Sequence, residues 1–259
     1  MPTLAVNGLT IPILVGSLKR SFEEVGESPR AFDGTIRTNR RYTKRVLEFD
    51  LPVLPQLDVL AWVALLRGDG HAWPFDSNLY SSKGLPAVNA LATIGATAPV
   101  PKYGAGRLSG GGGSTTCATA LGPVWTVALW VWSGSVWNHY VVNSSAQKWL
   151  NGARNDATST TFLSVDSAGN FSLATGFYDD VVALPCLTPT SWPPVLYATG
   201  RAFPLAPRLE AYGDLFPGST ASAPVLMRAE VGEVEYEPSL QAGAYTATSC
   251  KLSVKLREE

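Results

Sequence analysis

The chain has 259 residues, enough for one large or two modest domains, and its composition is 46% hydrophobic and only 16% charged. That balance excludes a disordered chain, which needs few apolar residues and many charges. The formal net charge of −1 excludes a general electrostatic attraction to nucleic acid or to anionic membranes, and no apolar run is long enough to predict membrane insertion.

Two elements are expected in the first third of the chain. Residues 44–51 alternate in side-chain character, with Leu47, Phe49 and Leu51 on one face, which predicts a β-strand. The following apolar residues recur at helical spacing and predict one helix, with Pro55 at its entry and Gly68 at its end. The residues of this apolar stripe are Leu57, Leu60, Ala61, Ala64 and Leu65.

Charge density falls sharply in the middle of the chain. Residues 85–192 contain eight charged side chains, against thirty-three in the two flanks, and six of the eight Trp. This shift predicts a separate domain, residues 86–192, inserted into a host domain formed by residues 1–84 and 193–259.

Five short strands are expected in the middle segment, a number and spacing typical of a β-sandwich. β-Branched and aromatic residues predict strands at 126–132 and 139–142. The pair Asn151-Gly152 follows a strand at 148–150 and predicts a tight turn with positive φ. The last two strands are expected at 171–174 and 179–184.

The end of the chain contains a second alternating segment. Residues 251–256 alternate between Leu or Val and polar side chains, and residues 225–236 are expected to be the partner strand. Between the middle segment and this pair, several prolines predict an extended connection with few ladder hydrogen bonds. They are Pro193, Pro194, Pro204, Pro207 and Pro217.

Three cysteines, Cys117, Cys186 and Cys250, are far apart and odd in number. No Cys-x-x-Cys pair exists, so a thiolate metal site is not expected. Free thiols are expected instead, which is consistent with synthesis in a reducing compartment. Calcium needs six or more oxygen ligands and no such set is evident, so no metal or other cofactor is assigned.

An ordered set of short motifs runs through the middle segment: G-x-G at 104–106, TV-x-LWV at 126–131, W-x-HY at 137–140, WLNG at 149–152, YDDV at 178–181 and LT at 187–188. This order resembles the laminin-G-like, concanavalin-type jelly-roll family. The resemblance implies a β-sandwich that binds sugars or protein surfaces, in some members with calcium.

The flanks contain a second set of motifs: GESPRAFDG at 26–34, RRYTKR at 40–45, GHAWPFD at 70–76 and RLEAYGD at 208–214, together with the predicted helix and the closing strand. This set resembles minor and distal tail proteins of siphophages. The resemblance implies a mainly β host domain, a barrel or sheet with one helix, that forms a homo-oligomeric ring, usually six-fold, between neighbouring tail proteins. It also implies assembly in the host cytoplasm and a final place in the virion tail.

Residues 30–45 are strongly basic, with six cations against the single Asp33. A charge run of this kind is commonly a solvated surface, but in a ring-forming protein it also suits an interface with an acidic neighbour, or the wall of a lumen that DNA passes through. The candidate assembly residues are Arg37, Arg40, Arg41, Lys44 and Arg45.

Sugar binding, if the sandwich has it, is assigned to Trp137, Trp149 and Asn151, because these two Trp are the ones expected to be exposed. Alternation places Trp130 and Trp132 on one face, which is assigned to the sandwich core. Of the adjacent Asp179 and Asp180, one is expected to turn inward and bind backbone amides at a strand start, while the other faces water.

Two histidines are present, and neither is assigned a catalytic role: His71 is interpreted as a turn residue and His139 as a core or rim residue. Three functions stay open: a structural component of a phage tail, which we favour, a free lectin-like carbohydrate-binding protein, and a glycoside hydrolase. The hydrolase needs two carboxylates on one face, about 5–10 Å apart. Residues 86–192 contain four Asp, two of them adjacent, and no Glu. No enzymatic activity is therefore expected.

Overall fold

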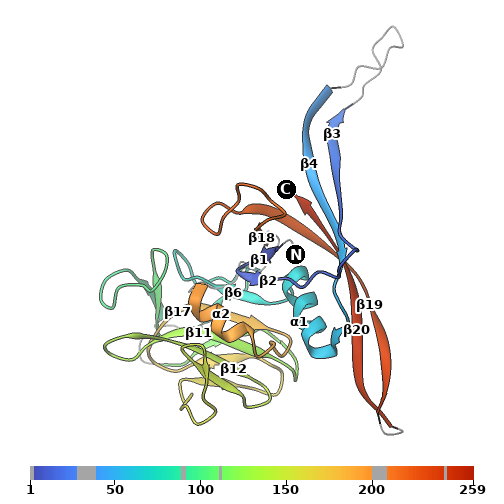
Figure 1. Ribbon diagram of the computed structural model, residues 1–259. Coiled ribbons are helices and arrows are strands. Elements are labelled where there is room, and N and C mark those ends of the chain that lie inside the picture. The colour runs from blue at the N-terminus through green and yellow to red at the C-terminus, as the bar shows by residue number, and fades with distance from the viewer. Residues whose placement is uncertain (1–2, 28–38, 89–91, 111–112, 200–208, 242–243) are drawn as a thin grey trace. The chain divides into compact units, whose positions relative to one another are not determined.

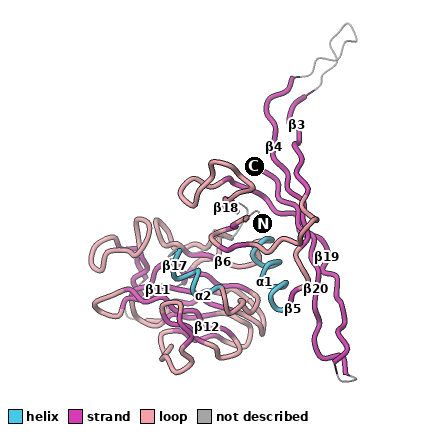
Figure 2. The backbone as a smooth tube through the Cα atoms, in the orientation of Figure 1, coloured by secondary structure: helices cyan, strands magenta, loops and turns pink. Residues whose placement is uncertain are grey.

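A computed structural model describes residues 3–27, 39–88, 92–110, 113–199, 209–241 and 244–259. These residues are mainly β, with antiparallel sheets and two helices (Figure 2), so the predicted fold class is confirmed. None of the described helices has the length and hydropathy that a bilayer crossing requires. The chain divides into two compact units: unit 1 is Met1–Val6, Thr10–Gln56 and Arg208–Glu259, and unit 2 is Asn7–Leu9 and Leu57–Pro207.

These units do not divide at the predicted boundaries. Most of residues 57–84, expected in the host domain, group with unit 2. Strand β6 (His71–Trp73) pairs with β17 (Phe177–Leu184) in a sheet of unit 2. Trp62 of helix α1 (Gln56–Arg67) also contacts Trp192, with ring centroids 5.1 Å apart. Charge density in the sequence therefore locates the insertion only approximately.

Unit 1 is built on one open antiparallel sheet. The described strands have the order β2-β1-β18-β19-β20-β4-β3, and β5 pairs with β20 beside this path. Strands β2 and β3 are therefore its two edges among the described residues. The bounds are β1 (Ala5–Val6), β2 (Leu9–Thr10), β3 (Lys19–Glu27), β4 (Asn39–Asp50), β5 (Leu54–Pro55), β18 (Leu209–Tyr212), β19 (Val225–Gln241) and β20 (Ala244–Glu258).

The two ends of the chain meet in this sheet. β20 pairs with β4 from Ser253↔Asp50 to Arg257↔Val46, and with β19 along most of its length. The predicted pairing of the chain ends, and of residues 225–236 with 251–256, is thereby confirmed. Alternation buries one face of these strands, including Leu47, Phe49 and Leu256.

Two hairpins of unit 1 extend beyond this sheet as two-stranded ribbons. β4 pairs with β20 through residues 46–50, whereas its residues 40–45 pair with β3 alone among the described strands. β19 and β20 continue to pair as far as Gln241↔Ala244. β4 pairs with β20 near the C-terminal end of β20, whereas the β19–β20 turn lies at the N-terminal end of β20. The two ribbons therefore leave the sheet in opposite directions (Figure 1).

Unit 2 contains a β-sandwich. One sheet has the order β15-β16-β10-β7, and the other has the order β14-β13-β12-β11-β17-β9-β8 with β6 beside β17. All five predicted strands are present, and Asn151 (φ 51°) and Gly152 (φ 81°) form the predicted turn. The bounds are β7 (Ala87–Val88), β8 (Ala92–Gly95), β9 (Arg107–Gly110), β10 (Thr115–Cys117), β11 (Thr126–Trp132), β12 (Trp137–Asn143), β13 (Lys148–Leu150), β14 (Ala153–Arg154), β15 (Leu163–Val165) and β16 (Phe171–Leu173).

The core of the sandwich lies between the two sheets. Leu129 and Tyr178 from the larger sheet meet Phe171 and Leu173 from the smaller one, and all four are almost fully buried. Trp73 of β6 joins this cluster, with its ring 5.4 Å from that of Phe171 in an edge-to-face arrangement. The three cysteines are free, as predicted, and all three are buried.

The helices differ from the prediction in two ways. In α1 the buried face is wider than the expected stripe, since Val59, Trp62 and Leu66 are buried while Leu57 is 51% exposed. A second helix, α2 (Trp192–Thr199), forms where an extended connection was expected. Pro193 and Pro194 lie in its first turn, where the missing N–H has no partner to lose, so the expectation of a single helix is wrong.

Candidate functional site

Four of the five predicted assembly residues lie in β4. Arg37 falls outside the described residues; Arg40 and Arg41 lie in β4, where only the backbone is described. Lys44 is half-buried, and its ammonium lies 5.8 Å from the centroid of the Tyr42 ring.

Arg45 serves an internal role. Its Nε donates to Glu258 Oε2 at 2.9 Å, its Nη2 donates to Oε1 at 3.0 Å, and its backbone N–H donates to Oε2 at 3.0 Å. The hydrogen bond to Glu258 raises the pKa of Arg45, and in return the pKa of Glu258 is lowered. Because the pair connects β4 to β20, this cation stabilises the sheet of its own chain.

The charged face of the same sheet is cross-linked in a similar way. Lys255 Nζ lies 3.4 Å from Glu48 and 4.0 Å from Glu230, on the strands to either side. Arg257 pairs with Glu23 of β3. A groove of about 500 Å³ runs beside Lys255 over these strands, and the Lys255, Glu48 and Glu230 charges that line it are paired across the ladder.

Strand β3 combines an edge position with an exposed aromatic residue. No described strand pairs with its outer side, so the backbone groups on that side are available to an added strand. Phe22, at the middle of β3, is 71% exposed, and Tyr42 on β4 is 51% exposed. The candidate assembly residues were chosen from the basic run, and those that are described lie in β4. A Phe flanked by charges on both sides in residues 19–24 was the sequence signal for β3.

On unit 2, the face of β11 that carries Trp130 is not the sandwich core. Val127, Leu129 and Val131 point into the core, so alternation turns Trp130 to the other face. Trp130 is 3% exposed there, with its ring 5.8 Å from that of Tyr197 on α2 (Figure 1) and 5.0 Å from that of His139. The assignment of this face to the core is therefore wrong: helix α2 buries part of it from outside.

The three predicted sugar-binding residues have different environments. Trp149 is only 2% exposed, which rules out the expected stacking surface at this residue. Asn151 is engaged in the hairpin, because its Oδ1 accepts the His139 N–H at 2.9 Å and its Nδ2 donates to Asn138 at 3.0 Å. Trp137 is half-buried, and its Nε1 donates to the Val100 carbonyl at 2.9 Å.

Trp137 belongs to a small aromatic rim on the sandwich. It lies directly opposite Trp132 at the end of the β11–β12 hairpin, with ring centroids 5.6 Å apart in an edge-to-face arrangement. Trp132 is also half-buried. The neighbouring Val136 and Val100 are 54% and 73% exposed. These four residues, here named the aromatic rim, form an apolar surface next to the hydroxyls of the hairpin turn.

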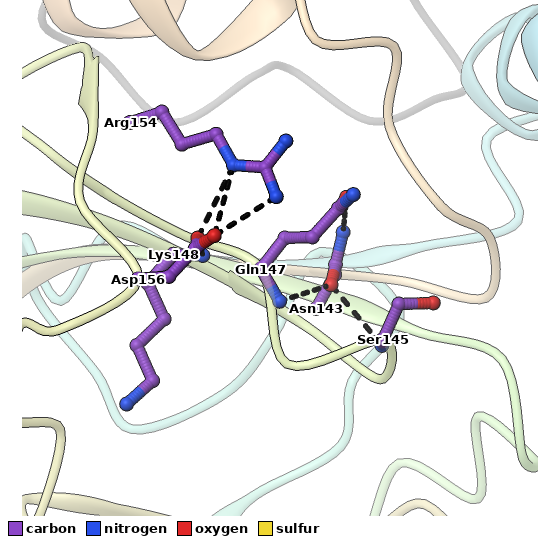
Figure 3. A network of polar contacts seen from close by, with 6 residues as sticks. All are labelled: Asn143, Ser145, Gln147, Lys148, Arg154 and Asp156. Atoms are coloured by element: carbon purple, nitrogen blue, oxygen red, sulfur yellow. Dashed lines mark hydrogen bonds and ion pairs between the residues drawn. The ribbon is translucent and has the colours of Figure 1, made fainter.

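Close by in the chain, two polar clusters fix the turns around β13 (Figure 3). Asn143 Oδ1 accepts the N–H groups of Ser145 and Gln147, each at 3.1 Å, and closes the β12–β13 turn. Asp156 accepts the Lys148 N–H at 3.0 Å and pairs with Arg154 at 2.8 Å. These groups hold the turns on either side of β13.

Of the two adjacent Asp, Asp179 is the one that turns inward and binds backbone amides. It is fully buried; its Oδ2 accepts the N–H groups of Lys102 at 2.7 Å and Tyr103 at 3.1 Å, and its Oδ1 accepts that of Asp180 at 2.9 Å. Burial raises its pKa to about 6, although these hydrogen bonds act in the opposite direction. Asp180 is also buried, at 8% exposed, so the expectation that one of the two Asp faces water is wrong. By fixing residues 102 and 103, Asp179 holds the Lys102 ammonium 4.7 Å from the Trp130 ring centroid.

The two histidines are both buried strand residues. His71 lies in β6 and stacks on Trp73 at 5.7 Å, so its interpretation as a turn residue is wrong. His139 is 5% exposed, as expected for a core position, and burial lowers its pKa to about 4. Within the described structure, its Nδ1 has no hydrogen-bond partner.

No protein-family model and no curated protein matches this chain. Its function therefore has to be inferred from its own residues. Of the surfaces described above, the β3–β4 ribbon suits association with another chain, and the aromatic rim suits an apolar or sugar-like ligand.

Proposed function

We propose that this protein is a structural component of a phage tail that assembles with copies of itself through the sheet of unit 1. The resemblance of the flanking motifs to distal and minor tail proteins supports a ring, six-fold in that family, with neighbouring tail proteins as further partners. Its location is the virion tail, after assembly in the host cytoplasm. No catalytic step and no cofactor form part of this function.

The observation that carries the proposal is the pair of two-stranded ribbons. Isolated two-stranded hairpins are at best marginally stable in water, because a third strand or a packed face is needed for independent stability. No third described strand lies beside residues 40–45 of β4 or beside the β19–β20 pairs from Pro238↔Thr248 to Gln241↔Ala244. Contacts with neighbouring copies supply the missing cover.

Exposed aromatic residues on the first ribbon support the same conclusion. Phe22 and Tyr42 are more than half exposed on β3 and β4, and large aromatic side chains are enriched at protein interfaces. Since Arg45 and Arg257 are paired within the chain, shape and strand pairing contribute more to this interface than a free basic patch does.

The mass of the full chain in solution tests the proposal. Light scattering after size exclusion, from low to high micromolar concentration, should give a discrete multiple of the chain mass, and electron micrographs of that peak should contain rings. A monodisperse monomer throughout that concentration range, at low and physiological salt, would contradict the proposal.

The aromatic rim supports carbohydrate binding by unit 2 as a second candidate function, either within the tail or in a free lectin-like protein. Two half-exposed indoles with adjacent hydroxyls match the apolar faces and polar edges of a sugar ring. On a glycan array, the full chain should bind a subset of glycans, Trp137→Ala should abolish that binding, and Tyr80→Ala, which truncates another exposed aromatic residue of unit 2, should preserve it. Equal signals from Trp137→Ala and the parent chain exclude the rim as the binding surface.

A further inference from the structure

Strand β3 has a charge pattern that is complementary to itself when reversed. Its first seven residues are Lys19, Arg20, Ser21, Phe22, Glu23, Glu24 and Val25. Two cations precede Phe22 and two anions follow it. Two antiparallel copies of such a strand bring the basic half of each against the acidic half of the other.

Alternation along β3 decides which of these charges meet. Arg20, Phe22 and Glu24 share one face of the strand. Phe22 is 71% exposed, and Arg20 and Glu24 are exposed as well. The face therefore presents a cation, an aromatic ring and an anion, in that order, beside the edge of the sheet.

We propose that the edge strand β3 pairs antiparallel with β3 of a second copy, about a two-fold axis through Phe22. In this register the two Phe22 rings are opposite each other, and each Arg20 lies opposite Glu24 of the other copy. Ser21 lies opposite Glu23, and Lys19 lies opposite Val25, so no like charges are directly opposed. The inference rests on the proposed self-assembly and adds to it a two-fold contact between copies.

Neighbouring registers fit less well. A two-fold axis perpendicular to the sheet keeps each face continuous, which requires a residue of β3 to lie opposite itself. Centring on Glu23 places that carboxylate against its own copy, which is repulsive. Centring on Ser21 places Lys19 opposite Glu23 but Phe22 opposite Arg20, so the two exposed Phe22 rings no longer face each other. Phe22 is the centre that joins opposite charges and buries the exposed ring.

Charged residues on an edge strand also serve to prevent pairing, which is the competing explanation for this pattern. An edge strand whose charges prevent pairing would leave the Phe22 ring exposed to water, whereas an edge strand that pairs with its own copy buries this ring. Because a two-fold contact differs from the contact that closes a ring, it joins two rings or two chains. Breaking the contact is therefore expected to halve the mass of the particle.

Charge reversal provides the decisive experiment. Arg20→Glu alone opposes two anions at each of the two symmetric pairs, and Glu24→Arg alone opposes two cations. In each variant the dissociation constant of the β3–β3 contact should rise roughly tenfold or more. The particle should then have half the mass of the wild-type particle. Mixing the two variants should restore that mass, because Glu at position 20 then meets Arg at position 24, and Arg20 meets Glu24. The double variant Arg20→Glu/Glu24→Arg should assemble by itself.

Thiol cross-linking checks the register independently. Phe22→Cys lies opposite itself and should give covalent dimers with a short thiol-specific cross-linker, since the natural cysteines are buried. Val100→Cys, with a similarly exposed side chain in unit 2 (73%), is the matched control and should remain uncross-linked. The contact is overturned if the wild type assembles but the charge variants have the wild-type mass and Phe22→Cys, like Val100→Cys, remains uncross-linked. This outcome leaves the proposed function intact. A monomeric wild type overturns both.

Discussion

The buried carboxyl group of Asp179 predicts an unusual dependence of stability on pH. Asp179→Asn replaces a fully buried titrating group by a neutral one of the same shape. Burial raises the pKa of Asp179 to about 6 in the folded protein, whereas an unfolded Asp titrates near about 3.9. The folded state therefore binds this proton more tightly, and protonation of Asp179 stabilises unit 2.

The size of the effect follows from this difference in pKa. A shift of roughly two pKa units corresponds to about 3 kcal/mol between the protonation states. Relative to Asp179→Asn, the free energy of unfolding of the wild type should rise by up to that amount as the pH falls from about 6.5 to about 4. Above pH 6.5 the difference should be constant, because Asp179 is then ionised in both states.

Tryptophan fluorescence during urea unfolding measures this in the full chain. All eight Trp lie in unit 2, so the signal reports the unfolding of that unit. Other titrating groups, including His139, are present in both proteins and cancel in the comparison. If the two free energies of unfolding stay parallel between pH 6.5 and 4, the raised pKa assigned to Asp179 is wrong.

Three further outcomes are expected. Burial lowers the pKa of His139 to about 4 in the folded state, so relative to His139→Gln the wild type should lose stability as the pH falls below about 6.5. The same fluorescence assay measures this difference, and parallel pH profiles of the two proteins would contradict it. Gly152→Ala should destabilise unit 2 by more than Gly134→Ala does, because both glycines have positive φ but an added Cβ meets helix α2 only at Gly152. Gly134→Ala should lower the free energy of unfolding by about 1 kcal/mol. Equal urea midpoints of the two variants would contradict the contact with α2. In unit 1, a double-mutant cycle of Arg45→Ala and Glu258→Ala should give a coupling free energy of about 0.5–1 kcal/mol. Amide hydrogen exchange of β4 and β20 measures it. Additive effects of the two substitutions would show that the ion pair does not stabilise the sheet.

Much of the secondary structure was predictable because its signals are local. The alternation around Leu47 and Phe49 defines β4, and Asn151-Gly152 closes the β13–β14 turn in the expected conformation. Even the pairing of the chain ends followed from two alternating segments that needed partners. These patterns arise from backbone geometry and side-chain period, and both are properties of a few consecutive residues.

The environments of the aromatic residues were less predictable. Alternation places Trp130 on one of two faces, but it does not say which face the second sheet covers. Here the second sheet covers the face of Leu129, and α2 packs on the Trp130 face. Trp149 was expected to be exposed and is buried. Burial depends on segments distant in the sequence, so these assignments failed although the strands were right.

For this protein, the sequence by itself determined the β class, the main strands and the two alternating segments that bring the chain ends together, because each depends on the order of neighbouring residues. Only the tertiary structure decided that β3 is an edge, that Arg45 is used within its own sheet, and that Trp137 lies on a rim beside Trp132. The physical reason is that edge position, burial and ion pairing are relations between distant segments, which exist only after the chain has packed.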